Sequence, residues 1–165
     1  MIESNTESIY VAVPYEIHES ATLGEMKMAQ KVRKDVVWWL GSAKDDYRSA
    51  LRLYEVGMHA NALNLLHTSI EKALKAAILW SGKRYPRGAE GHKLNLLYVM
   101  VKPKLLLPKR LEEAIFDLTP LYLPTKYPDA AFGIPSKVYG REYSSKYVRK
   151  AGEIIRWVER KMSRR

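Results

Sequence analysis

Apolar side chains recur every three or four residues over most of the chain, and this period limits the possible folds more than any other feature. From Trp39 onward the repeat matches the 3.6 residues of a helical turn, so the apolar residues share one face of each segment. We predict helices over residues 39–54, residues 63–81, residues 92–102, residues 108–122 and from Ser144 or Ser145 to about Met162. The side chains expected to face inward are Trp39, Leu40, Ala43, Tyr47, Ala50, Tyr54, Leu63, Leu66, Ile70, Ala73, Leu74, Ala77, Leu94, Leu97, Tyr98, Val101, Leu111, Ile115, Leu118, Tyr147, Ala151, Ile154, Val158 and Met162.

Glycine and proline separate the helical segments. Gly57 is well placed to end the first helix, and the short link after it predicts an antiparallel pair with the second. The stretches "SGKRYPRGAEGH" (81–92) and "LPTKYPDAAFGIPSKVYG" (123–140) are rich in both residues, so we predict a loop over the first and no regular structure in the second. At 165 residues the chain fits one domain, an all-α helical bundle.

The first 37 residues follow a different pattern. "IYVAVPYEI" (9–17) is typical of an extended segment, while Thr22 and Glu25 form a capping-box pair that predicts a helix start. Whether that helix continues into the one holding Trp39 stays open. We therefore predict an N-terminal extension over residues 1–37 and a helical domain over residues 38–165.

Charge is divided unevenly along the chain, whose net value is +10. Residues 1–25 carry five acidic and no basic side chains, whereas residues 137–165 carry ten basic and three acidic ones. A basic surface of this kind favours a polyanion such as RNA, DNA or a nucleotide. The alternative is that the acidic arm lies on the basic face and cancels part of its charge.

Other classes of function are disfavoured. The chain has no cysteine, which excludes disulfides and thiol chemistry and agrees with a reducing compartment. No apolar run is long enough to cross a bilayer, and no signal segment opens the chain, so we expect a cytoplasmic protein without membrane contact.

Five short motifs occur in order along the helical region. "EKALKA" (71–76) closes an alanine-rich helix that follows "WWLGSAKDD" (38–46), and "HKL" supplies His92 and Leu94 at the next helix start. Tyr122 and "KYPD" (126–129) come after the fourth helical segment, and Trp157 with Val158 forms a "WV" pair near the end. Over residues 38–160 the chain resembles HEPN domains (higher eukaryotes and prokaryotes nucleotide-binding).

This resemblance implies a fold, an assembly and a function. The fold would be an up-and-down four-helix bundle core of two hairpins, usually paired as a homodimer. The function would be nucleotide or RNA binding, often beside a minimal nucleotidyltransferase in a toxin–antitoxin or defence setting. Active members are metal-independent ribonucleases, with an arginine, a polar neighbour and, four to six residues on, a histidine after the fourth helix.

Lys126 matches the position of that arginine, and this change argues against catalysis. Unlike arginine, lysine cannot bind a phosphate through a bidentate pair of hydrogen bonds. Where the histidine is expected, the chain has Ala131, Phe132 and Gly133. Binding remains possible. The residues that we assign to nucleotide or RNA binding are Lys126, Tyr127 and Asp129, for phosphate, base and ribose hydroxyl, with Arg149 and Arg156 on the last helix. The alternative is that "YPD" only forms a turn.

Arg87 and His92 form a cation–imidazole pair, which has the groups needed to cut RNA without a metal. The resemblance places them in the loop between the second and third helices, away from the usual site, so we do not assign them a catalytic role. His92 is instead expected to satisfy backbone groups at a helix start.

His67, Glu71 and Lys75 share one stripe of the second helix, and salt bridging between the last two explains them better than a metal site. We expect no metal and no cofactor. A metal-independent ribonuclease and a purely structural partner subunit remain the alternatives to a binding domain.

Overall fold

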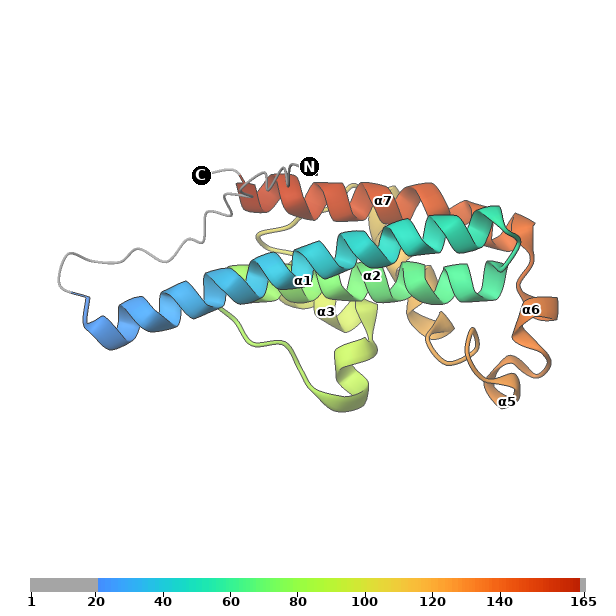
Figure 1. The fold of residues 1–165 in the computed structure, drawn as a ribbon, viewed down its shortest axis with the longest axis horizontal. Coiled ribbons are helices and arrows are strands. Elements are labelled where there is room, and N and C mark those ends of the chain that lie inside the picture. The colour runs from blue at the N-terminus through green and yellow to red at the C-terminus, as the bar shows by residue number, and fades with distance from the viewer. Residues whose placement is uncertain (1–20, 164–165) are drawn as a thin grey trace, which may run out of the picture.

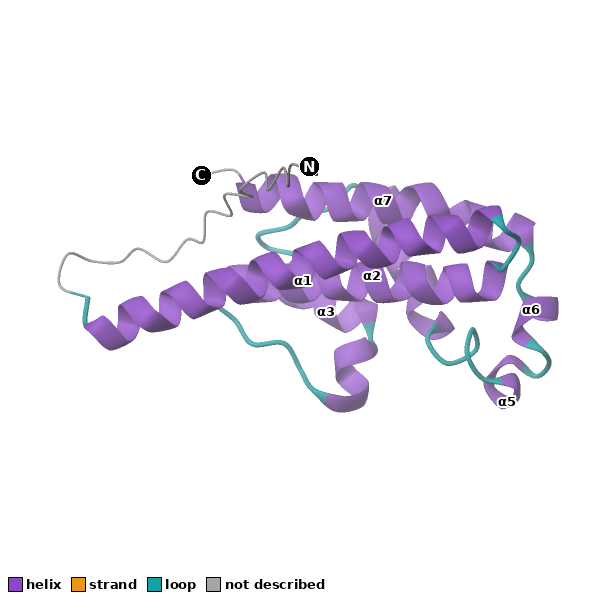
Figure 2. Cartoon of the chain, in the orientation of Figure 1, coloured by secondary structure: helices purple, strands orange, loops and turns teal. Residues whose placement is uncertain are grey.

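The computed structural model of the protein describes residues 21–163. Within this range Figures 1 and 2 show helices joined by loops, without a strand. The elements are α1 (Leu23–Glu55), α2 (His59–Trp80), the 3-10 helix η1 (Gly88–His92), α3 (Leu94–Val101), α4 (Lys109–Leu118), the 3-10 helix η2 (Thr119–Leu121), α5 (Pro128–Ala131), α6 (Pro135–Val138) and α7 (Arg141–Ser163). The stretch 9–17, expected to be extended, lies outside the described residues.

Helix α1 begins with the expected capping box. The Thr22 hydroxyl accepts a hydrogen bond from the Glu25 backbone N–H at 3.3 Å, and the Thr22 N–H donates to the Glu25 carboxylate at 2.7 Å. From there the helix continues without a break through Trp39 to Glu55, which answers the question that the sequence left open. Its N-terminal part extends past the rest of the bundle (Figure 1). None of the described helices has the length and apolar character needed to cross a membrane.

Helix α2 lies at the centre of the bundle and packs against α1, α7 and α3. The side chains expected to face inward from α2, α3, α4 and α7 are all buried, which confirms the helical period as a guide to the core. On α1, Leu40, Ala43 and Ala50 are buried and Trp39 is half-buried beside them. The chain is therefore an all-α bundle, as predicted.

The expectation that residues 123–140 have no regular structure is wrong. Two single-turn helices, α5 and α6, form there, and each has a proline at its start, Pro128 and Pro135. Proline is tolerated at the first helical position because the N–H that it lacks would have no intrahelical partner there.

The start expected for the last helix is also wrong, because α7 begins at Arg141. Ser144 lies inside its first turn, where the hydroxyl donates to the Gly140 carbonyl at 3.1 Å instead of capping an N–H group. Likewise α3 begins at Leu94 rather than near His92, which closes η1.

A close approach between α1 and α7 gives a test of the packing. A Cβ atom on Gly152 would lie 2.4 Å from the Tyr47 hydroxyl oxygen and 2.6 Å from its ring carbon Cζ. We expect Gly152→Ala to lower the free energy of unfolding by about 1–3 kcal/mol in urea denaturation, despite the better helix propensity of alanine. Gly41→Ala, in α1 with no atom within 4 Å of the new Cβ, should raise it by up to about 1 kcal/mol. Stabilisation by both substitutions would contradict the close contact.

Candidate functional site

Glu71 lies in the middle of α2, and its carboxylate is the centre of a buried polar cluster. Only 7% of the side chain is exposed. Lys75 Nζ donates to Oε1 at 2.7 Å, and His92 Nδ1 lies 3.0 Å from Oε2. The Lys75 ammonium also lies 5.2 Å from the ring centroids of both Trp39 and Tyr85. The buried carboxylate is therefore paired with one cation and one imidazole, and the predicted Glu71–Lys75 salt bridge is confirmed.

This contact fixes the tautomer and the orientation of His92. An ionised carboxylate only accepts hydrogen bonds, so Nδ1 carries the proton, and Nε2 is left to bind another group. The imidazole stacks on the Tyr122 ring with a centroid separation of 4.4 Å and an interplanar angle of 9°. About 37% of the His92 side chain is exposed, so a ligand can reach it. The expectation that this ring serves a helix start is wrong, because its Nδ1 bonds to Glu71.

Lys126 reaches the same aromatic ring from the segment after η2. Its Nζ lies 4.0 Å from the Tyr122 ring centroid, a cation–π distance. The preceding residue anchors this segment: buried Thr125 donates to the Leu121 carbonyl at 2.7 Å and accepts from Asn64 of α2 at 3.1 Å. The structure thus brings His92 and Lys126, which come from different loops, onto one tyrosine.

His67 lies beneath this group, one turn before Glu71, and is fully buried. Its ring centroid is 5.3 Å from that of Tyr122, and its Nδ1 is 3.9 Å from Glu71 Oε2. The His92 backbone is near, but neither ring nitrogen has a hydrogen-bond partner of good geometry among the described residues. Burial lowers the pKa of His67 to about 4; the Glu71 charge opposes this shift, and Lys126 and His92 add to it. His67 is consequently neutral at pH 7.

The other residues singled out from the sequence are exposed and lie on several elements. Tyr127 and Asp129 belong to the start of α5, directly after Lys126. Arg149 and Arg156 lie on the outer side of α7, where Arg149 Nε is 3.2 Å from Glu153. Arg87 precedes η1. The structure therefore joins His92 to Lys126 and its neighbours, and it leaves the α7 arginines on a separate helix.

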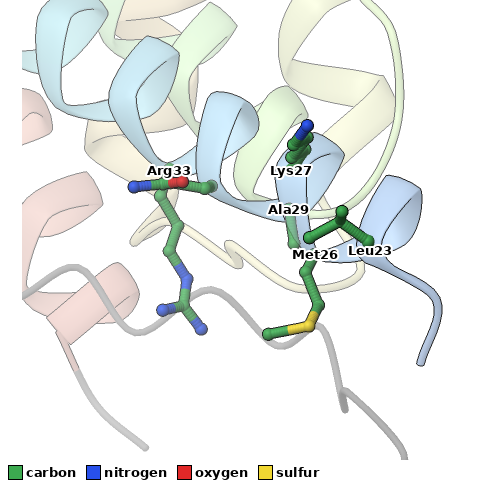
Figure 3. Close-up of a pocket in the computed structure, with 6 residues that line it drawn as sticks. Leu23, Met26, Lys27, Ala29 and Arg33 are labelled. Atoms are coloured by element: carbon green, nitrogen blue, oxygen red, sulfur yellow. The ribbon is translucent and has the colours of Figure 1, made fainter. Parts of the chain in front are cut away.

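A pocket of about 450 Å³ lies elsewhere, beside the N-terminal part of α1 (Figure 3). The described residues that line it all come from α1: Leu23, Met26, Lys27, Ala29, Gln30 and Arg33. Polar groups from separate elements do not converge there, so the cluster around Tyr122 is the better candidate site. Among residues 21–163, no three His, Asp or Glu side chains are placed to share a metal ion.

Residues 36–161 match the family model described as HEPN domain. The chain belongs to the HEPN domain family. The match begins within α1, so the first turns of that helix precede it, and the predicted boundary between residues 37 and 38 falls inside α1. That boundary stays a prediction.

Two solved structures resemble this HEPN domain over nearly their whole length. TT1696 from Thermus thermophilus is 29% identical, with a TM-score of 0.68, and the similarity covers 76% of this chain and 97% of that chain. ST0689, an archaeal HEPN homologue, is 23% identical, with a TM-score of 0.62, and the similarity covers 77% of this chain and 97% of that chain. At this identity the comparison shows the fold alone. The comparison with curated proteins gives no match.

Two parts of the site are not predicted by the sequence of this HEPN domain. Tyr122 stands out there only as a motif residue, although its ring contacts both His92 and Lys126. The helical spacing pairs Glu71 with Lys75 but not with His92, because no local spacing links residues of α2 to residues of η1. The stripe of His67, Glu71 and Lys75 was the available signal, since three polar groups on the face of a central helix need partners.

The Glu71 cluster can be tested by an isosteric change. Glu71→Gln removes the negative charge and leaves Lys75 buried without a carboxylate, so we expect the free energy of unfolding to fall by about 3–5 kcal/mol. The matched control is Glu113→Gln, which removes an exposed carboxylate 3.9 Å from Lys109 at the same helical spacing. The control should change stability by less than about 0.5 kcal/mol in urea denaturation. Equal effects in the two variants would show that Glu71 does not hold the cluster together.

The low pKa of His67 predicts a loss of stability in mild acid. The unfolded chain takes up a proton near pH 6.5, the ordinary value, whereas the folded chain resists it until about pH 4. The free energy of unfolding is therefore not reduced by His67 above pH 6.5, and it falls by about 3 kcal/mol as the pH drops to 4. Urea denaturation at several pH values should show this decline, and His67→Leu should remove it. An identical acid dependence in the variant would show that another group is responsible.

Proposed function

We propose that this HEPN domain binds RNA or a nucleotide at the surface formed by His92, Tyr122 and Lys126. The observation that carries the proposal is the shared ring: Lys126 Nζ lies 4.0 Å from the Tyr122 centroid, and His92 stacks on the same tyrosine. The partly exposed imidazole offers a ring for a base, and the ammonium on the same tyrosine offers a charge for a phosphate. Membership of the HEPN family supports a nucleotide- or RNA-related function in general.

Each exposed group near this surface has a role in the proposal. Lys126 neutralises a phosphate as a point charge, Tyr127 stacks against a base, and Asp129 accepts a hydrogen bond from a ribose hydroxyl. Arg149 and Arg156 add phosphate contacts along α7, and the net charge of +10 attracts a polyanion to the whole surface.

The assembly and the biological setting rest on the resemblance of the motifs. In this proposal the domain pairs as a homodimer and acts with a minimal nucleotidyltransferase in a toxin–antitoxin or defence setting. A structural subunit for such a partner, with little affinity for RNA of its own, is the alternative.

Metal-independent RNA cleavage is a second candidate function, and one observation favours it. Glu71 holds His92 through Nδ1, so Nε2 is available to exchange a proton, and the Lys126 cation contacts the same tyrosine ring as this imidazole. General acid–base chemistry needs an imidazole oriented in this way. The arginine that the resemblance implies is still replaced by Lys126, which is why binding remains the first proposal.

A gel assay with labelled RNA at two salt concentrations tests the proposal. We expect retardation that weakens steeply as salt rises, because phosphate contacts release bound counterions. Lys126→Ala should weaken binding several-fold and reduce the salt slope by about one charge. Lys104→Ala is the matched control, since its ammonium lies 6.0 Å from the Trp80 ring on another part of the bundle.

Absence of retardation at low salt, or equal effects of the two lysine variants, would contradict the proposed site. The same gels, run with a metal chelator and scored for shortened RNA, decide the second candidate. Cleavage that His92→Asn abolishes would establish it, and intact RNA would reject it.

A further inference from the structure

Phe132 ends α5 in a conformation that phenylalanine rarely adopts. Its φ angle is 51° and its ψ angle 36°, in the left-handed region, and 98% of the residue is exposed. It is the one non-glycine residue with a positive φ among residues 21–163. The next residue is Gly133, which takes the left-handed region without steric strain but does not occupy it here. The turn thus holds an aromatic ring in solvent at a position usually given to glycine.

Neither the turn nor the core explains this phenylalanine. The turn is closed by backbone bonds alone, with the Gly133 N–H donating to the Pro128 carbonyl at 3.0 Å. A left-handed helix end favours glycine, and a ring that is 98% exposed packs against almost nothing. A side chain that neither the backbone conformation nor packing explains points to a role outside the folded monomer.

A second ring and two lysines accompany Phe132 on this segment. Tyr127, at the other end of α5, is 52% exposed and follows Lys126 directly. Lys137 is exposed on α6, which packs against α5. Figure 1 shows both short helices together at one end of the molecule. Two exposed rings flanked by cations therefore continue the surface that begins at Tyr122.

We propose that α5 is a stacking platform for single-stranded RNA, on which successive bases lie against Tyr127 and Phe132 while Lys126 and Lys137 neutralise the phosphates. The inference rests on the proposed function, and it narrows the ligand from any nucleotide to an extended strand. Aromatic side chains interleaved with cations are how proteins hold single strands without reading their sequence.

The presence of two exposed rings favours a strand over a mononucleotide or a duplex. Tyr127 directly precedes α5 and Phe132 directly follows it, so the rings belong to opposite ends of this short helix. A mononucleotide has one base to offer them, whereas a strand offers a base to each ring. In a duplex the base faces are already stacked on one another, so neither ring can contact them.

Exposed aliphatic side chains on the same segment, Leu123, Ile134 and Val138, make a protein contact the competing explanation. The charge favours RNA, because residues 122–140 carry Lys126 and Lys137 against the single acidic residue Asp129. Continuity with the Lys126–Tyr122–His92 stack favours it as well.

The chain provides its own matched control, since it contains two phenylalanines. Phe116, on α4, is 46% exposed. Fluorescence anisotropy of the full chain would compare a labelled unstructured 12-nucleotide RNA, the same RNA in a duplex, and a labelled mononucleotide. Phe132→Ala should weaken binding of the single strand about tenfold, as expected for one lost base stack, and leave mononucleotide binding unchanged. Phe116→Ala should change neither.

Phe132→Gly separates binding from folding. Glycine suits the left-handed backbone, so this variant should unfold at the same or a higher urea concentration than the wild type and still lose about tenfold in single-strand affinity. Phe132→Trp should keep the affinity, and its added indole fluorescence should be quenched when the strand binds.

Unchanged single-strand binding by Phe132→Ala, or equal affinity for duplex and single strand, would overturn the platform. If Lys126→Ala still weakens binding in that case, the proposed function stands and only the stacking platform is rejected. If the wild type binds none of the three probes, both fail. Loss of self-association in Phe132→Ala, measured by light scattering, with RNA binding intact would assign the ring to a protein contact instead.

Discussion

A buried carboxylate in the middle of α2 fixes the groups around the candidate site. Removing Glu71 from water costs several kcal/mol, and only well-placed partners offset that loss. Lys75, on the same helix, places its ammonium 2.7 Å from the carboxylate. His92, in η1, places its Nδ1 donor 3.0 Å from the carboxylate. The second contact joins the α2–α3 connection to the central helix. Through it, the position of the imidazole on Tyr122 depends on one buried charge.

The distribution of charge follows from this arrangement. Glu71 and Lys75 cancel each other in the interior, and burial keeps His67 neutral, so these groups add no net charge beneath the site. Lys126 is exposed and retains its positive charge at the surface, beside a ring that presents its negative face to the ammonium. In the proposed function a phosphate binds at Lys126, above an interior whose charges are balanced, so anion binding does not require burying an unpaired charge.

The sequence predicted the parts of the structure that depend on local pattern. The helical period placed Leu66, Ile70 and Ile154 in the core correctly, and the Thr22–Glu25 spacing placed the start of α1. Prediction from the sequence failed where one residue type occurs in two kinds of local structure. Prolines read as loop signals begin α5 and α6, and serines read as caps bond to carbonyls inside α7. The Glu71–His92 contact could not be predicted, because it joins separate elements without a sequence period.

Position along the chain proved a poor guide to position in space for His92 and Lys126. One belongs to the connection before α3 and the other to the segment after η2, yet both contact Tyr122, because each connection folds back over the same face of α2. The Tyr122 cluster and the end of α5 present two kinds of aromatic surface. Tyr122 is half-buried and held by neighbours, so it fixes geometry, whereas Phe132 is free in solvent and can follow a ligand. In our proposal the bases stack on Tyr127 and Phe132, while Tyr122 contacts His92 and the phosphate-binding Lys126, and such a site suits a ligand longer than a single nucleotide.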